Sequence, residues 1–163
     1  MKTTMALLGV LTLPALPAQA AGIFTDAFDP ALNRRVIEWR GVPSPEGIVF
    51  SVIASQFKTS AGHATTDFRT QLSTFGDRVR FHGCSASRWE LNGQLYLPLK
   101  GQYRLAGLDE RYGEYFVAQP TRQDLEWVAM NTRVDYRLCR LRESLSAEDL
   151  QGLRWVLQAA EAG

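Results

Sequence analysis

The sequence predicts a mainly β fold, an antiparallel up-and-down β-barrel of about seven or eight strands with one C-terminal α-helix packed outside it. Three observations lead to this prediction. From residue 47 onward, short segments alternate apolar and polar residues, the breaks between them are short, and a helical repeat of apolar residues appears near the C-terminus. Alternation is typical of a strand that buries one face, whereas a repeat every three or four residues is typical of a helix.

The clearest alternation runs through residues 93–132 and predicts a meander of four strands. Its apolar positions are Leu95, Leu97 and Leu99, then Tyr103 and Leu105, then Tyr115 and Val117, then Leu125, Trp127 and Ala129. The breaks at residues 100–101, 109–110 and 119–121 are too short for the crossover helices that parallel strands need. The strands are therefore expected to pair antiparallel.

Further strands are expected before this meander. Residues 47–55 form a strongly apolar run, and residues 64–73 alternate well. Gly76 and Asp77 suit a hairpin turn that leads into another strand carrying Val79 and Phe81.

Two shorter segments, residues 34–40 and 87–91, are candidates for extra strands. The rest of residues 21–46 is interrupted by prolines and is interpreted as a segment that wraps the domain formed by residues 47–163.

One helix is expected at the C-terminus. Ser146 can cap its first turn, and Asp149 stands three residues later in the capping-box position. The apolar positions at helical spacing are Leu150, Leu153, Val156, Leu157 and Ala160. Such a stripe normally packs against its own domain.

Residues 1–20 have the pattern of a secretory signal peptide: Lys2, an apolar stretch over residues 6–16, and Ala18-Gln19-Ala20 as a cleavage site. No cysteine lies near this site, so lipid attachment is not expected there. The sequence predicts a periplasmic or secreted protein without an integral membrane span. Removal of Lys2 makes the basic residues equal in number to the 17 acidic ones, which argues against nucleic acid as a partner.

Cys84 and Cys139 are the only cysteines, and an oxidising compartment favours a disulfide between them. A redox-active pair is more usually spaced Cys-x-x-Cys, and a metal site needs more ligands. The bond would close a loop of about 55 residues and contribute about 4 kcal/mol in the chain-entropy view.

The second half of the chain resembles the lipocalins, especially the bacterial ones. The sequence YRLAGLD at residues 103–109, followed by Tyr112 and by YFV at residues 115–117, is similar to the second conserved block of that family. Residues 125–132 resemble its last barrel strand and residues 145–157 its helix. In the first half, residues 65–84 are similar to the second and third strands.

The chain departs from the lipocalins in their first and third conserved blocks. Val49 stands where the family has a tryptophan, and Asn131 where it has an arginine that packs across that ring in a cation–π contact of about 0.5–2 kcal/mol. Loss of both together is consistent with a pocket refilled by smaller residues. In another alignment Trp39 or Arg133 takes the old role.

The resemblance implies a small hydrophobic ligand, of the fatty acid or phospholipid class, inside the barrel. The residues expected to face that ligand are Phe68, Leu72, Phe81, Leu95, Leu97, Tyr103, Leu105, Tyr115, Val117 and Trp127. Each of them taken singly is also an ordinary core residue. The alternative is therefore an interaction or structural protein on the same scaffold with a filled core.

Catalysis is not expected. His63 and His82 are the only histidines, and the grouping of Ser60, His63 and Asp67 has no nucleophile turn beside it. Glu114 is interpreted as a surface residue. The sequence contains no phosphate-binding glycine loop and no metal-spaced cluster, so no cofactor and no metal is expected.

Overall fold

Two antiparallel sheets and two helices make up the fold of the described residues, which are 21–58, 64–108 and 111–161 in this computed structural model. In chain order the elements are β1 (Ile23–Asp29), β2 (Arg34–Arg40), β3 (Val49–Lys58), β4 (Ala64–Gly76), β5 (Arg88–Leu91), β6 (Gln94–Leu95), the 3₁₀ helix η1 (Leu97–Leu99), β7 (Gln102–Leu108), β8 (Arg111–Ala118), α1 (Arg122–Met130), β9 (Val134–Leu138), β10 (Leu141–Ser144) and α2 (Ala147–Glu161). The expected mainly β, antiparallel fold with a C-terminal helix is confirmed.

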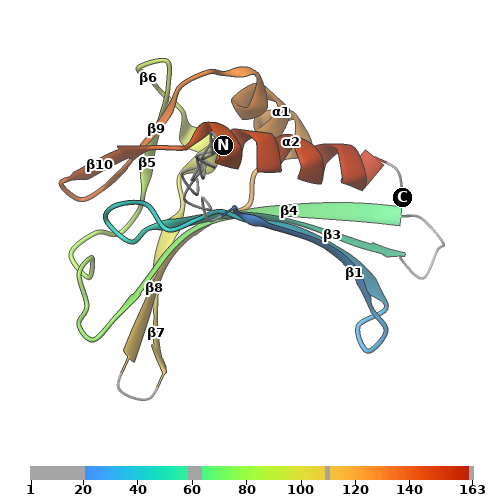
Figure 1. Cartoon of the computed structure of the whole chain (residues 1–163), viewed down its shortest axis with the longest axis horizontal. Helices are drawn as coiled ribbons and strands as arrows, with labels where there is room; N and C mark the ends of the chain where they lie inside the picture. Colours follow the sequence, from blue (N-terminus) through green and yellow to red (C-terminus); the bar gives the residue numbers. More distant parts are fainter. Residues whose placement is uncertain (1–20, 59–63, 109–110, 162–163) are drawn as a thin grey trace, which may run out of the picture.

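The larger sheet has six strands in the order β1-β2-β3-β4-β8-β7. It is strongly curved, and both helices lie on its convex side (Figure 1). Its outermost strands are β1 and β7, which are not paired with each other. In the part of the chain that the structure describes, the sheet is therefore open, and the closed barrel expected from the sequence is not found.

The N-terminal part of the chain contributes two strands to this sheet. The strands expected at residues 34–40, 47–55 and 64–73 are present as β2, β3 and β4. Residues 21–46, interpreted as a wrapping segment, instead supply the antiparallel hairpin of β1 and β2. Asp26 in β1 and Arg35 in β2 form a salt bridge of 2.6 Å that joins the two strands.

Helix α2 covers the convex face as its apolar stripe predicts. The five stripe residues are all buried, and Ser146 Oγ accepts a hydrogen bond from the backbone N–H of Asp149. Trp39 of β2 lies against the helix at Gly152, where an added Cβ would overlap the indole ring. The indole N–H of Trp39 donates to Asp149 Oδ1 over 3.3 Å, so one carboxylate caps the helix and anchors the sheet.

Residues 125–129, expected to be a strand, lie instead in helix α1. Thr121 caps it, and Asp124 completes a capping box. The buried residues Leu125, Val128 and Ala129 follow helical spacing. The alternation of Leu125, Trp127 and Ala129 was therefore a misleading signal, and the Thr121-x-x-Asp124 pattern was the decisive one.

Of two other expected strands, one is shortened and one is absent. Residues 97–99 form the 3₁₀ helix η1, which has a proline in its first turn, and only Gln94–Leu95 are paired as a strand. The expected strand at Val79 and Phe81 is a loop, because β4 runs on to Gly76 and pairs there with β8.

The smaller sheet has the order β10-β9-β5-β6, and its β5 confirms the strand expected at residues 87–91. It packs on the larger sheet through Trp89, whose ring centre lies 6.2 Å from that of Phe50. A disulfide between Cys84 and Cys139 connects the loop after β4 to the turn between β9 and β10, with Cα atoms 5.4 Å apart. The predicted disulfide is confirmed.

Candidate functional site: an open trough on the concave face

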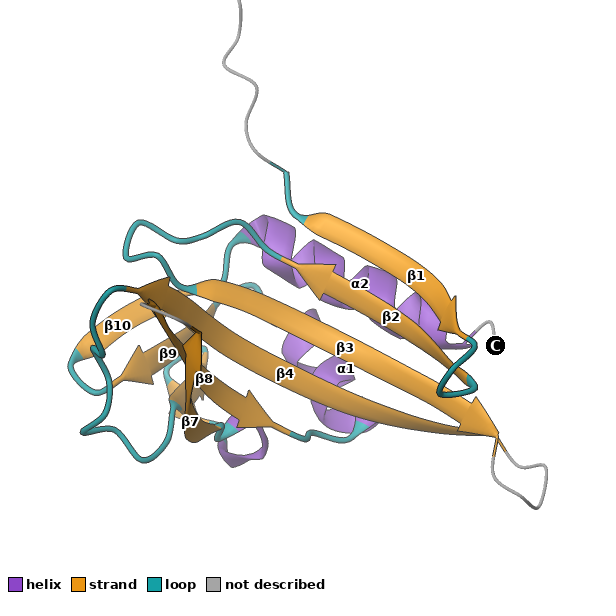
Figure 2. Cartoon of the chain, turned by 90° about the horizontal axis from the view of Figure 1, so that it is seen from below, coloured by secondary structure: helices purple, strands orange, loops and turns teal. Residues whose placement is uncertain are grey.

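The concave face of the six-stranded sheet carries no described helix (Figure 2). Directly opposed residues on neighbouring strands project to the same face of a sheet. Ile37 and Trp39 of β2 face α2, so their neighbours Val36 and Glu38 project to the concave side. The register then extends this concave set to Ser55 and Asp67 in one row, and to Ile53 and Arg69 in the next.

A hollow of about 890 Å³ lies on this face, and we call it the trough. Its lining residues are Arg34, Val36, Glu38, Ile53, Ser55, Phe57, Thr66, Asp67, Phe68, Arg69, Gln119, Pro120, Thr121 and Arg122. From β2 and β3 only alternate residues take part, as expected for one face. From β4 the four consecutive residues 66–69 take part, so the trough also reaches around the edge of that strand.

The trough reaches this edge because β8 leaves β4 early. The two strands pair only from Thr70 opposite Ala118 to Gly76 opposite Tyr112. After Ala118 the chain turns away through Gln119 and Pro120 into α1. The first half of β4, before Thr70, therefore has no described strand on the β8 side.

The floor of the trough is apolar and its rim is charged. Ile53 is buried and Phe57 is 37% exposed, and the small Ser55 between them leaves depth. The Nε atom of Arg34 is buried without a hydrogen-bond partner, 4.0 Å from Asp29 Oδ2. Such an arrangement can hold an apolar chain along the floor and an anionic group near the rim.

Another arginine of the lining already forms ion pairs within the protein. Arg122 pairs with Glu126 over 2.7 Å and also with Glu161, so it joins α1 to α2. It therefore forms part of the wall and is less able to bind a ligand than Arg34.

The residues predicted to face a ligand do not come together in one place. Phe68, Leu72 and Phe81 are buried in the core, and Tyr103 packs partly buried against it. Tyr115 and Val117 project to the opposite face of the sheet from their core neighbour Phe116. The exposed members are Leu95, Leu97, Leu105 and Trp127. Phe68 is the one member of the predicted set that also lines the trough.

Sequence reasoning missed Val36, Ile53 and Phe57, although a signal was present. In β3 the residues Phe50, Val52 and Ala54 face the core, while Val49, Ile53 and Phe57 face the concave side. A strand that is apolar on both faces needs a cover on both. One face of β3 lies on the core, and the other forms the trough floor.

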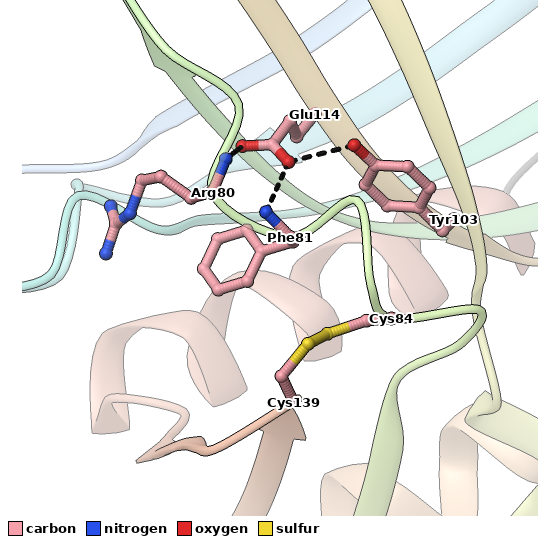
Figure 3. Close-up of a disulfide and its surroundings, with 6 residues drawn as sticks. All are labelled: Arg80, Phe81, Cys84, Tyr103, Glu114 and Cys139. Carbon is pink, nitrogen blue, oxygen red and sulfur yellow. Dashed lines mark hydrogen bonds between the residues drawn. A yellow bond between two sulfur atoms is a disulfide. The ribbon is translucent and has the colours of Figure 1, made fainter.

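Glu114 was interpreted as a surface residue, and this was wrong, because its exposed fraction is 1%. Its carboxylate accepts hydrogen bonds from the backbone N–H groups of Arg80 and Phe81, over 2.8 and 2.7 Å, and from the hydroxyl of Tyr103 over 2.9 Å (Figure 3). Burial, and then this bond to Glu114, raises the pKa of Tyr103 to about 12. These bonds hold the loop that leads to Cys84.

The two positions that depart from the lipocalin blocks lie in different kinds of element. Val49 begins β3 and is paired with Ser73. Asn131 ends helix α1, where its amide donates to the carbonyl of Trp127 and its oxygen accepts from Asn92. The hydrogen-bond partners of Asn131 therefore lie in α1 and in the turn between β5 and β6.

A second hollow, of about 470 Å³, lies where the segment after β2 meets the start of α2. Its lining includes Ile48, Phe50, Tyr136 and Asp149. Burial, and then its bond to Glu143, raises the pKa of Tyr136 well above its ordinary value. The polar groups here already bind each other, as Tyr136 donates to Glu143 and Asp149 accepts from Ser146.

The residues considered for catalysis are not assembled in the described structure. Ser60 and His63 lie outside the described residues, and His82 is exposed on a loop. No group of three His, Cys, Asp or Glu residues that could hold a metal ion is found in residues 21–58, 64–108 and 111–161. Within the same ranges, neither helix is long and apolar enough to cross a membrane.

Compared with protein-family models, curated proteins and solved structures, the chain matches none.

Proposed function

We propose that this chain is an exported binding protein without catalytic activity, and that it carries a small hydrophobic ligand of the fatty acid or phospholipid class in the trough. The observation that carries the proposal is an 890 Å³ hollow with an apolar floor and a charged rim. The volume is in the range of pockets that bind small molecules, and polar and charged residues outnumber the apolar ones in its lining. The lipocalin resemblance suggests the same ligand class, with the ligand held on one side of an open sheet.

Export is supported by the disulfide. Cys84 and Cys139 are bonded, and such bonds persist mainly in oxidising compartments. Together with the signal-peptide pattern of residues 1–20, this favours a periplasmic or secreted protein.

The rim supports a ligand with an anionic head. The trough is lined by Arg34 and Arg69, and no ion-pair partner of Arg69 is present among the described residues. An arginine at a partly dry site binds a carboxylate or phosphate through paired N–H donors. Glu38 and Asp67 on the same rim disfavour a dianionic head by repulsion.

The second candidate is an interaction protein with a filled interior. It is favoured by the position of Phe68, Leu72 and Phe81, which pack in the core although the sequence assigned them to a ligand. This candidate needs no small ligand at all.

A fluorescent fatty acid distinguishes the two candidates. The delipidated protein without residues 1–20 is titrated with the probe, and saturable binding of one probe per chain is expected. Val36→Glu, which introduces a carboxylate on the trough floor, should weaken binding about tenfold or more, equivalent to about 1.4 kcal/mol. Leu97→Glu is the matched control, because Leu97 is 64% exposed and does not line the trough.

Binding that does not saturate, or that both variants weaken alike, would exclude the carrier proposal and favour the interaction protein.

A further inference from the structure

The first half of β4 has an unpaired edge inside the sheet. Residues 64–69 pair with β3 on one side, while β8 occupies the other side only from Thr70 onward. In a strand, alternate residues direct their N–H and C=O groups toward each edge. Some backbone donors and acceptors of residues 64–69 therefore face the trough without a described partner strand.

The shape of the trough fits this edge. Thr66, Asp67, Phe68 and Arg69 all line it, although successive side chains project to opposite faces. The edge of the strand is the common surface of four consecutive residues. The segment 119–122, which follows directly on β8, lines the same hollow.

We propose that this edge binds an extended peptide segment of a partner protein, which adds a strand to β4 in line with β8. Strand addition of this kind derives its affinity from backbone hydrogen bonds and its specificity from alternate side chains. The added strand lies antiparallel to β4, as β8 does. This inference concerns a polypeptide partner and goes beyond the small ligand proposed for the trough floor.

The side chains of β4 define the preferred peptide. Asp67 and Arg69 project to the concave side, so a basic and an acidic residue are favoured directly opposite them. Thr66 and the buried Phe68 project to the other face, where β-branched residues are favoured. Read antiparallel from Arg69 to residue 64, the complementary sequence is EVKVTT.

The opposing interpretation is that Asp67 and Arg69 protect the edge against pairing, since charged residues often do so. The two interpretations predict different binding of charged peptides. A protective edge repels every strand, whereas a binding edge discriminates between peptides of opposite charge order.

The test uses blocked synthetic peptides and isotope-labelled, delipidated protein observed by NMR. EVKVTT should shift the backbone amide signals of residues 64–69 and slow their hydrogen exchange. The charge-swapped peptide KVEVTT should bind more weakly than EVKVTT, by a factor of up to about five. In the double variant Asp67→Lys with Arg69→Glu, this preference should reverse. Both side chains are exposed, so this variant should fold.

Two N-methylated versions of EVKVTT, blocked on alternate sets of amides, complete the test. An added strand directs only one set of amides toward β4, so one version should keep binding and the other should lose it. The edges of β1 and β7 serve as internal references. Equal shifts at those edges, equal loss for both methylated versions, or no shift at millimolar peptide would overturn the proposal.

Discussion

The two faces of the six-stranded sheet are built from the same strands but have different partners. On the convex face, Ile37, Trp39 and Val52 are almost fully buried beneath α2 and the smaller sheet. On the concave face, apolar Val36 and Ile53 are flanked by the charged residues Glu38 and Arg69 and border a hollow. The same strands therefore pack against the core on one side and border an open hollow on the other.

The difference follows from how much apolar surface each face can remove from water. Continuous apolar rows on the convex face bury well against a helix, and each large side chain contributes about 1.5–3 kcal/mol when fully buried. Charged side chains on the concave face cannot be buried with a similar gain in free energy. Substitutions on the two faces should therefore differ sharply in their effect on stability.

The largest expected effect is the loss of Trp39. Trp39→Ala should lower the free energy of unfolding by about 3–5 kcal/mol, because the ring fills the space between β2 and Gly152 of α2. Urea denaturation of this variant beside Val36→Ala provides the comparison. Val36 projects to the concave face and should cost about 1 kcal/mol or less. Similar losses for both would mean that the faces do not differ in packing.

Loss of the disulfide should cost about as much as the chain-entropy estimate, about 4 kcal/mol. Intact mass before and after reduction should differ by two hydrogens, and Cys84→Ser with Cys139→Ser should melt at a lower temperature. The bond joins the loop held by Glu114 to the smaller sheet, on the covered side of the molecule. Unchanged trough binding in this variant would show that the concave face forms independently of it.

A buried carboxylate of the smaller sheet should make the free energy of unfolding depend on pH. Bonds from Ser144 and then from Arg133 and Arg142 lower the pKa of Asp135 to about 2. Its folded-state pKa lies below the unfolded value, so its stabilising effect is present above about pH 4 and lost as the pH falls toward 2.

Asp135→Asn should therefore cost up to about 2 kcal/mol at neutral pH, and the difference from the parent protein should shrink between about pH 4 and pH 2. Denaturation series at several pH values measure it. A difference that stays constant over this range would exclude the charge as its cause.

The smallest expected effect concerns the helix that the sequence pattern did not reveal. Thr121→Ala should cost about 1 kcal/mol, because Thr121 accepts from the backbone N–H of Asp124 and caps α1. Thr132→Ala, an exposed threonine beyond the end of α1, is the matched control and should leave stability unchanged. If the two variants have the same melting temperature, the cap contributes nothing.

Local signals explain what the sequence predicted well. The apolar run of β3, the alternation of β4 and the cap and stripe of α2 each depend on neighbours in the chain. The disulfide was predicted from a single pair of cysteines and from the signal-peptide pattern of residues 1–20. The prediction of a strand at residues 125–129 was wrong because the apolar residues of this segment fit both a period of two and helical spacing. Only the N-terminal cap distinguishes the two patterns.

Tertiary features explain what could not be predicted. The sequence of β8 allows two phasings. The inward face can carry Tyr115 and Val117, or Glu114 and Phe116. The carboxylate argued for exposure, yet Glu114 is buried by donors from a loop more than 30 residues earlier. The trough depends on the point along β4 at which β8 departs. The predicted break at residues 119–121 marks the end of β8, but no local pattern around Thr70 indicates that Ala118 pairs there.

The most direct test of the trough is methyl NMR of Ile53 and Val52 during titration with a fatty acid. These neighbours in β3 project to opposite faces, one toward the trough and one toward the core. Saturable shifts of the Ile53 and Val36 methyl signals are expected, while the signals of Val52 and Val156 should stay unchanged. Shifts of Val52 and Val156 instead, or no saturable shift at any methyl group, would contradict the proposed binding in the trough.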